Sequence, residues 1–276
     1  MTYRFLLLFS FIVGMTYGQS TASKNIEIFS LNSTELDTLK TIWVYTPTSY
    51  TDDSLSYPVV YMFDGQNLFD NETSFVGEWG VDEYLDQSHS DLIIVGIEHG
   101  NRKRLEELTP FPNHQYGGGK ADAMIDFIIK TLKPRIDSSY RTKTDARYTS
   151  IAGSSLGGLS SFYAAWKHPD VFGNAGVFSP SFWINPELFD DVRDGTISTK
   201  TRFFFTVGTA ESETMVPDLE KMVSLLVQKG MSLNKIQTTI VEDAEHNETF
   251  WSSQLPSFME WLLKINQNRF YQDDKG

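Results

Sequence analysis

Cysteine is absent from all 276 residues of the chain, which excludes disulfide bonds, thiol nucleophiles and thiolate metal sites. Histidine is scarce: the five histidines are scattered, and none forms a His-x-x-x-His pair. The ligand patterns of a zinc hydrolase are therefore missing, and we expect no metal. Positive charge is also in short supply, because 23 Lys and Arg stand against 36 Asp and Glu, for a net charge of −13. This excess argues against nucleic acid and anionic membrane surfaces as partners.

The apolar run at the N-terminus is too short to cross a bilayer as a mature helix. Arg4 precedes the apolar stretch Phe5–Met15, and the small and polar residues Thr16–Gln19 follow it. A basic start, a short apolar region and small residues at the cleavage point are typical of a secretory signal peptide. We expect residues 1–18 to be removed and the mature protein to be secreted or periplasmic, without a membrane anchor.

Residues 19–276 contain no internal repeat, low-complexity block or linker, so they are expected to form one domain. Strand-like and helix-like segments alternate along them, and the middle strands are continuous apolar runs such as VVYMF and LIIVGI. Runs of this kind are typical of strands that are covered on both faces. The predicted fold class is α/β, with a mostly parallel central sheet of about eight strands and helices on both faces. The predicted strands are Asn25–Phe29, Lys40–Thr46, Val59–Phe63, Leu92–Ile97, Tyr148–Ala152, Ala175–Phe178, Arg202–Val207 and Lys235–Glu242.

The segment Gly153-Ser154-Ser155-Leu156-Gly157 lies between a predicted strand and a predicted helix. Gly-x-Ser-x-Gly at such a bend is the nucleophile elbow of α/β-hydrolases. The chain passes close to the positions two before and two after the nucleophile, so both must be small. Gly153 and Gly157 fit if Ser155 is the nucleophile, whereas a frame centred on Ser154 would put Leu156 at one of these places. The alternative is an inert Gly/Ser-rich turn.

A serine hydrolase of this type needs an acid and then a histidine after the nucleophile in the chain. Only His168 and His246 follow Ser155. His168 is expected to cap the helix after the elbow, while His246 follows the last predicted strand, where a general base should be delivered. The acid is expected in the loop after the strand Arg202–Val207, which offers Glu211 and, as a second candidate, Glu213. The alternative is a solvated acidic loop.

The oxyanion hole of such a site needs two backbone N–H groups. One belongs to the residue after the nucleophile, which is Leu156. The other comes from the loop after the third strand, where Gly65 permits close approach of the backbone. We expect Gln66 to be this donor, with Asn67 as the alternative.

Several segments, in this order along the chain, resemble the esterase D and enterochelin-esterase-like group of α/β-hydrolases. The resemblance implies carboxylic-ester hydrolysis without a cofactor, and Ser155, Glu211 and His246 match the triad positions of that group. One departure is Phe63, where many relatives have His; we expect this side chain to pack beneath the oxyanion loop. The connection Ser179–Thr201 is too short for the cap domain that many hydrolases insert there, so the site should be open. The matching segments are Tyr61–Asp70, Gly77–Trp79, Arg104 with Glu107 and Pro110, Pro134–Asp137 with Tyr140–Thr142, Gly153–Gly158, Ser179–Trp183, and His246-Asn247 with Trp251.

The substrate is expected to be a small-molecule or polysaccharide-borne ester. Phe111 and Tyr116 lie in the long loop after the fourth strand, and Trp183 follows the sixth, so these aromatic residues are candidates for the substrate rim. Such a rim suits acetylated or feruloylated carbohydrate and siderophore esters alike, and the alternative is packing of loops onto the sheet. A second hypothesis for the whole protein is a non-catalytic binding protein on a hydrolase scaffold.

Overall fold

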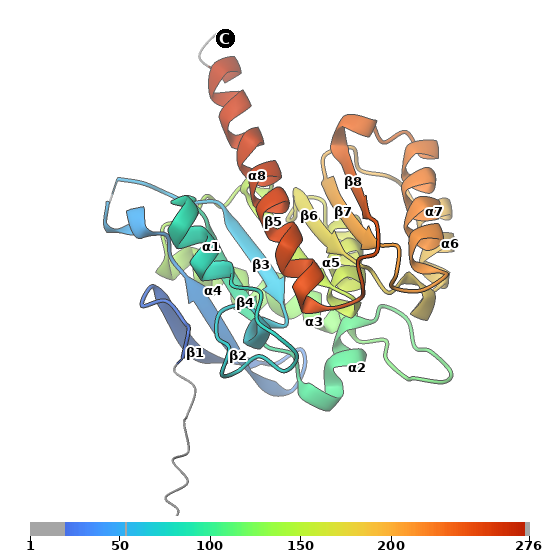
Figure 1. Ribbon diagram of the computed structural model, residues 1–276, viewed down its shortest axis with the longest axis horizontal. Helices are drawn as coiled ribbons and strands as arrows, with labels where there is room; N and C mark the ends of the chain where they lie inside the picture. Colours follow the sequence, from blue (N-terminus) through green and yellow to red (C-terminus); the bar gives the residue numbers. More distant parts are fainter. Residues whose placement is uncertain (1–19, 53, 274–276) are drawn as a thin grey trace, which may run out of the picture.

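An eight-stranded sheet in the order β1-β2-β4-β3-β5-β6-β7-β8 runs through the computed structural model, which describes residues 20–52 and 54–273 (Figure 1). β1 pairs antiparallel with β2 and β2 antiparallel with β4, whereas all the other neighbours are parallel. The predicted signal peptide, residues 1–18, lies outside the described residues. The strands are β1 (Ile26–Ser33), β2 (Thr38–Tyr45), β3 (Val59–Phe63), β4 (Ile93–Ile97), β5 (Thr149–Ser154), β6 (Asn174–Phe178), β7 (Arg202–Gly208) and β8 (Ile236–Val241).

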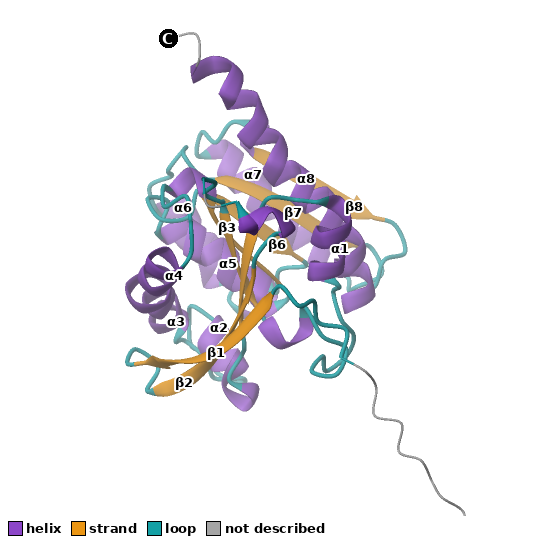
Figure 2. Cartoon of the chain, turned by 90° about the vertical axis from the view of Figure 1, so that its left-hand side faces the viewer, coloured by secondary structure: helices purple, strands orange, loops and turns teal. Residues whose placement is uncertain are grey.

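Helices cover both faces of this sheet (Figure 2). Every residue of β3, β4, β5 and β6 is buried, as the continuous apolar runs predicted. Among the described helices, none combines the length and the apolar character that crossing a membrane requires. The helices are α1 (Val81–Ser88), α2 (Arg104–Leu108), α3 (Ala121–Phe127), α4 (Lys133–Ser139), α5 (Leu156–Lys167), α6 (Glu187–Asp194), α7 (Met215–Gln228) and α8 (Glu248–Asp273).

The sheet separates two hydrophobic cores. On one face, α1 and α8 pack against the sheet through large aromatic side chains, including Trp251 of α8 beside Trp79 in the loop before α1. On the other face, α3, α5, α6 and α7 cover a larger core that contains Phe162, Phe203 and Phe205. Burial of this much apolar surface is the main source of stability in a chain without disulfide bonds. It makes a rigid frame for the loops at the carboxyl ends of the strands.

The predicted α/β fold is confirmed, and the helices add detail that the sequence did not indicate. Helix α3 continues through a π-helical turn (Ile128–Leu132) into α4, where Pro134 stands in the first turn and is tolerated. The connection after β6 contains a short helix, α6, that the sequence analysis did not predict. This connection carries no large cap domain, as expected, so the carboxyl ends of the strands are open above the site.

Candidate active site

Ser155 lies at the sharp bend between β5 and α5, with φ 58° and ψ −118°. Such a conformation is strained for a residue with a side chain, and strain of this kind is typical of functional sites. A Cβ atom on Gly153 would lie 2.8 Å from the carbonyl carbon of Gly157, and one on Gly157 would lie 3.2 Å from the Cβ of Phe63. Both glycines are therefore required by close packing. Ser154 is the last residue of β5 and is buried, so the elbow is centred on Ser155.

A chain of hydrogen bonds joins Ser155 to a buried carboxylate. Oγ of Ser155 lies 2.9 Å from Nε2 of His246, and Nδ1 of His246 lies 2.7 Å from Oε2 of Glu211. The side chain of Glu211 is 0% exposed, whereas that of His246 is 33% exposed. The imidazole thus lies between a hydroxyl at the site and a carboxylate in the interior, which is the arrangement that activates a serine nucleophile.

Two further donors hold the Glu211 carboxylate in place. Oε1 accepts hydrogen bonds from the backbone N–H of Gly208 and from the hydroxyl of Ser179, both at 2.6 Å. With Oε1 occupied in this way, Oε2 is left for His246. Glu213 is exposed on the same loop and makes no contact with His246. The structure therefore brings Glu211, and not Glu213, to the histidine.

Ser179 links this carboxylate to α8, a connection that the sequence analysis missed. The indole N–H of Trp251 donates to Oγ of Ser179 at 2.8 Å, and the Trp251 ring stands edge-on to the imidazole of His246, with 5.0 Å between ring centroids. Ser181, two residues further on, places its Oγ 3.2 Å from that of Ser155. The only signal in the sequence was the Ser-Pro-Ser-Phe-Trp segment after β6, which contains both serines.

The loops that carry the acid and the histidine are fastened to each other. The N–H of Ala210 donates to the carbonyl of Ala244 at 3.0 Å. Gly208 lies so close to that carbonyl that a Cβ atom would collide with it. Beyond the histidine, Oδ1 of Asn247 accepts the N–H of Phe250 at 3.0 Å and so caps the start of α8. His246 is thereby held between a pinned loop and a capped helix.

Two backbone N–H groups beside Ser155 are free to stabilise an anion. Within the described residues, the N–H groups of Gln66 and Leu156 donate to no other group, whereas the N–H of Asn67 donates to the carbonyl of Asp64 at 2.9 Å. Asp64 begins this loop in the left-handed conformation, with φ 60°. The geometry favours Gln66 over Asn67 as the second oxyanion donor.

A cavity of about 1000 Å³ opens beside Ser155. Loops after β3 and β4 and the start of α8 form much of its wall, and Ser155 and His246 also line it. Burial lowers the pKa of His99, and burial together with the negative charge of Asp64 raises the pKa of Glu248. Besides Ser155 and His246, the lining residues are Phe63, Asp64, Gln66, Asn67, Thr73, Phe75, Val76, Trp79, His99, Asn101, Arg102, Arg104, Ser154, Asn247, Glu248 and Trp251.

The three residues predicted for the substrate rim do not line this cavity. Phe111 packs edge-on against Tyr163, with 6.1 Å between centroids, so loop packing explains its position. Tyr116 and Trp183 pack edge-on against each other and are about half exposed. The sequence analysis missed Phe75 and Val76, which line the cavity and are 86% and 61% exposed. An apolar pair in an otherwise polar loop was the signal that could have identified them.

Comparisons with known proteins agree with this architecture. The sequence model of the "Putative esterase" family matches residues 33–262. The "Uncharacterized protein YbbA" of Bacillus subtilis is 27% identical over 239 residues, which cover 82% of this chain and 93% of that protein. An endo-1,4-beta-xylanase/feruloyl esterase of Xylanibacter ruminicola is 26% identical over 250 residues, which cover 87% of this chain and 31% of that protein.

A third relative, the iron(III) salmochelin esterase of Escherichia coli, is 25% identical over 227 residues, which cover 74% of this chain and 50% of that protein. Among solved structures, the enterobactin esterase of Shigella flexneri has the same fold, with a TM-score of 0.71 at 20% identity, covering 90% of this chain and 60% of that one. The chain therefore belongs to the "Putative esterase" family and is a carboxylic-ester hydrolase with the α/β-hydrolase fold.

Proposed function

We propose that this protein is an exported serine esterase in which Ser155, His246 and Glu211 form the catalytic triad. The observation that carries the proposal is the continuous hydrogen-bond chain from Oγ of Ser155 through both imidazole nitrogens to a fully buried carboxylate. Glu211 keeps the Nδ1–H tautomer of His246 and stabilises the imidazolium that forms during the reaction. A reaction that uses only these three side chains requires no cofactor.

The reaction proceeds in two acyl-transfer steps. In the first, Nε2 of His246 takes the proton of Ser155 as Oγ attacks the ester carbonyl, and the N–H groups of Gln66 and Leu156 stabilise the tetrahedral oxyanion. His246 then protonates the leaving alcohol, and the acyl group remains on Ser155. In the second step, His246 activates a water molecule that attacks the acyl-enzyme, and Ser155 leaves with its proton restored.

The cavity wall favours an ester with an aromatic acyl or aryl group, carried on a carbohydrate or a siderophore. Phe75, which is 86% exposed, lines the cavity together with the largely buried rings of Trp79 and Trp251, and a volume of about 1000 Å³ exceeds the needs of an acetyl group. Two relatives are named a feruloyl esterase and a salmochelin esterase, and a feruloyl group contains an aromatic ring. Acetylated carbohydrate is the smaller alternative.

Export is proposed from the N-terminal sequence. Residues 1–18 have the basic start and the short apolar core of a secretory signal. An open site is consistent with a large ester outside the cytoplasm. Detection of the processed protein in the periplasm or the medium, with a new N-terminus at Gln19, tests this point.

Hydrolysis of p-nitrophenyl acetate by wild-type protein and by Ser155→Ala tests the mechanism. We expect kcat/KM to fall by about 10⁴-fold or more, because the nucleophile and its base act as a unit. Ser154→Ala is the matched control and should retain activity. A fluorophosphonate probe should label wild type and Ser154→Ala but not Ser155→Ala. Equal labelling of all three proteins would contradict the assignment, and no labelling of wild type would favour the non-catalytic binding protein.

The substrate is tested with acetylated xylan, a feruloylated arabinoside and a catecholate trilactone, each supplied to purified enzyme. We expect the highest kcat/KM for one of the two aromatic esters. A higher value for acetylated xylan would contradict the aromatic preference while leaving the triad intact.

A further inference from the structure

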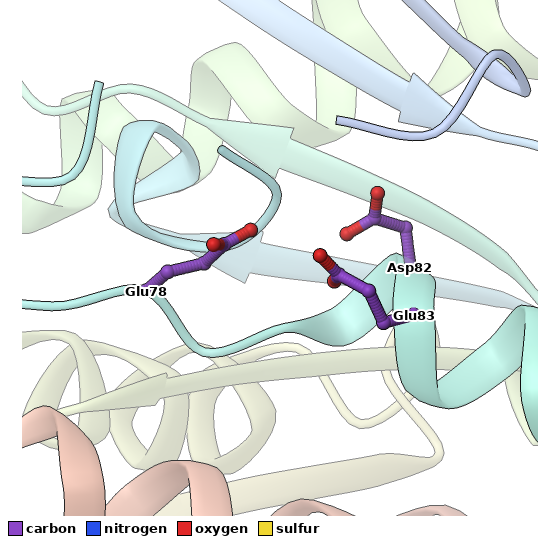
Figure 3. Close-up of side chains that lie close together, drawn as sticks. All are labelled: Glu78, Asp82 and Glu83. Atoms are coloured by element: carbon purple, nitrogen blue, oxygen red, sulfur yellow. The ribbon is translucent and has the colours of Figure 1, made fainter. Parts of the chain in front are cut away.

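Three carboxylates lie together beside the start of α1. Glu78 comes from the segment before the helix, and Asp82 and Glu83 come from its first turn (Figure 3). Each contributes a carboxylate oxygen that lies within 4.8 Å of the other two. The side chains point toward a shared space between the loop and the helix.

Two of these carboxylates have one oxygen that is hydrogen-bonded and one that is not. Oδ2 of Asp82 accepts the N–H of Ser23 at 2.7 Å, and Oε2 of Glu78 accepts the hydroxyl of Thr21 at 2.9 Å. Asp82 is 0% exposed. Its Oδ1 and the Oε1 of Glu78 are both buried and have no hydrogen-bond partner among the described residues. A buried polar atom without a partner costs stability, so these oxygens call for an explanation.

No lysine or arginine in the described part of the chain forms an ion pair with Glu78, Asp82 or Glu83. Two further carboxylates, Asp70 and Asp86, bind the same N-terminal segment through neutral donors. Negative charge near the first turn of a helix interacts favourably with its free N–H groups. That interaction explains why acids occur there, but it provides no partner for Oδ1 of Asp82. A buried carboxylate in this position is stable only with a proton or a cation beside it.

We propose that Glu78, Asp82 and Glu83 bind a calcium ion. Calcium prefers oxygen ligands and takes six to eight of them, so water molecules complete the shell. The hydrogen bonds from Thr21 and Ser23 orient the carboxylates of Glu78 and Asp82, as outer-shell donors do at metal sites. An all-carboxylate site has no histidine or cysteine pattern by which it could be identified in the sequence.

The ion would hold three parts of the protein together. The segment Ser20–Ser23, the loop before Trp79 and the first turn of α1 all meet at the three carboxylates. Trp79 lines the substrate cavity and its N–H donates to the carbonyl of Asn67 in the oxyanion loop at 2.9 Å. Calcium should therefore stabilise one wall of the cavity without touching Ser155, His246 or Glu211.

The test uses the full mature protein, stripped with EDTA, exchanged into chelator-free buffer at pH 8 and titrated with CaCl₂. We expect the Tm to rise by about 5 °C at saturation, because a ligand that binds only the folded state stabilises it. Terbium in place of calcium should give luminescence on excitation at 280 nm, since Trp79 adjoins Glu78. Excess calcium should displace terbium and so reduce this luminescence. Magnesium at the same concentration should reduce it less, because a flexible set of three carboxylates suits the larger ion.

Asp82→Asn and Glu78→Gln should each weaken the affinity for calcium and for terbium by at least tenfold. The calcium-dependent rise in Tm and the terbium luminescence should therefore be lost at concentrations that saturate the wild type. Glu72→Gln removes one negative charge from an exposed position in the same loop. This control variant should keep the calcium-dependent rise in Tm and the terbium luminescence. Far-UV circular dichroism at 20 °C verifies that each variant is folded. If Asp82→Asn does not fold, Glu78→Gln alone tests the site.

Absence of any calcium effect on Tm and of any terbium signal in wild type would overturn the proposal. In that case Asp82→Asn should raise the Tm at pH 8 without calcium, because Asp82 and Glu83 then merely share a proton. An equal calcium effect in wild type, Glu78→Gln and Asp82→Asn would place the ion elsewhere and would also overturn it. Hydrolysis of p-nitrophenyl acetate in the same samples keeps this test separate from that of the esterase mechanism.

Discussion

Asp64 accepts two hydrogen bonds from the guanidinium of Arg104, one from Nε at 2.8 Å and one from Nη2 at 2.7 Å. This planar, two-point contact joins the residue that starts the oxyanion loop to the start of α2. Burial alone would lower the pKa of Arg104, but the charge of Asp64 outweighs it and the net pKa is raised. The ion pair therefore fixes the backbone from which the N–H of Gln66 is presented.

Arg104→Gln should weaken catalysis through this loop. The substitution removes the ion-pair partner of Asp64, whose backbone has the left-handed conformation. Because this contact no longer holds the loop, the N–H of Gln66 should shift relative to the developing oxyanion. We expect kcat for p-nitrophenyl acetate to fall by about 10- to 100-fold, with little change in KM for this small ester. Arg102→Gln, which removes an exposed charge from the same cavity, is the control. Equal kinetics for the two variants would show that Arg104 does not position the loop.

Glu211→Gln and Glu213→Gln should separate the two acids that the sequence left open. Loss of the buried carboxylate at position 211 removes the acceptor that keeps the Nδ1–H tautomer of His246, so we expect kcat to fall by about 10⁴-fold. Glu213→Gln removes an exposed charge and should change kcat less than twofold. Steady-state hydrolysis at pH 8 measures both, and a larger loss at position 213 would reverse the assignment.

Gly208→Ala should disturb the site without changing any polar group. Its Cβ would collide with the carbonyl of Ala244, so the loop of the acid and the loop of the histidine must move apart. A displacement of this kind costs about 10²-fold in kcat even when every functional side chain is present. Ser212→Ala, in the same exposed loop, is the control, and wild-type kcat for Gly208→Ala would contradict the prediction.

Glu248→Gln should stabilise the protein at neutral pH and not at acid pH. Burial raises the pKa of this carboxyl above 4.5, its ordinary value, so the folded state holds the proton more tightly than the unfolded chain does. The free energy of unfolding therefore falls as pH rises through the unfolded pKa toward the higher folded one. The variant lacks this penalty.

We expect Glu248→Gln to raise the Tm by about 2 °C at pH 8 and to leave it unchanged at pH 4. Differential scanning calorimetry at both pH values measures the difference, with exposed Glu242→Gln as the control. A lower Tm at pH 8 would mean that ionised Glu248 stabilises the fold, for example through Arg104.

The sequence predicted the sheet well because burial on both faces leaves continuous apolar runs, as in Val59–Phe63 and Arg202–Gly208. Chain order identified Ser155 and His246 as candidates, since only one histidine follows a strand after the elbow. It could not choose between Glu211 and Glu213, because their difference lies in burial and in the hydrogen bonds from Ser179 and Gly208.

The residues predicted for the substrate rim lie outside the lining of the cavity for a related reason. A loop that leaves the carboxyl end of a strand reaches the neighbourhood of the site, but its own packing decides which way its side chains turn. Phe111 is held by Tyr163 and by hydrogen bonds between its backbone and the side chain of Asn185. These contacts depend on residues more than fifty positions away, and no local pattern around Phe111 indicates them.

The proposed catalytic residues and the cavity wall come from opposite halves of the sheet. Ser155, Glu211 and His246 follow β5, β7 and β8, whereas much of the wall follows β3 and β4, on the other side of β5 in the strand order. Loops such as that of Phe75 and Val76 can therefore vary in length and sequence without disturbing the hydrogen bonds of the triad. Mutations in the loops after β3 and β4 can therefore change which ester binds while Ser155, His246 and Glu211 keep their arrangement. The exception is the backbone around Gln66, the second proposed oxyanion donor, which must stay in place.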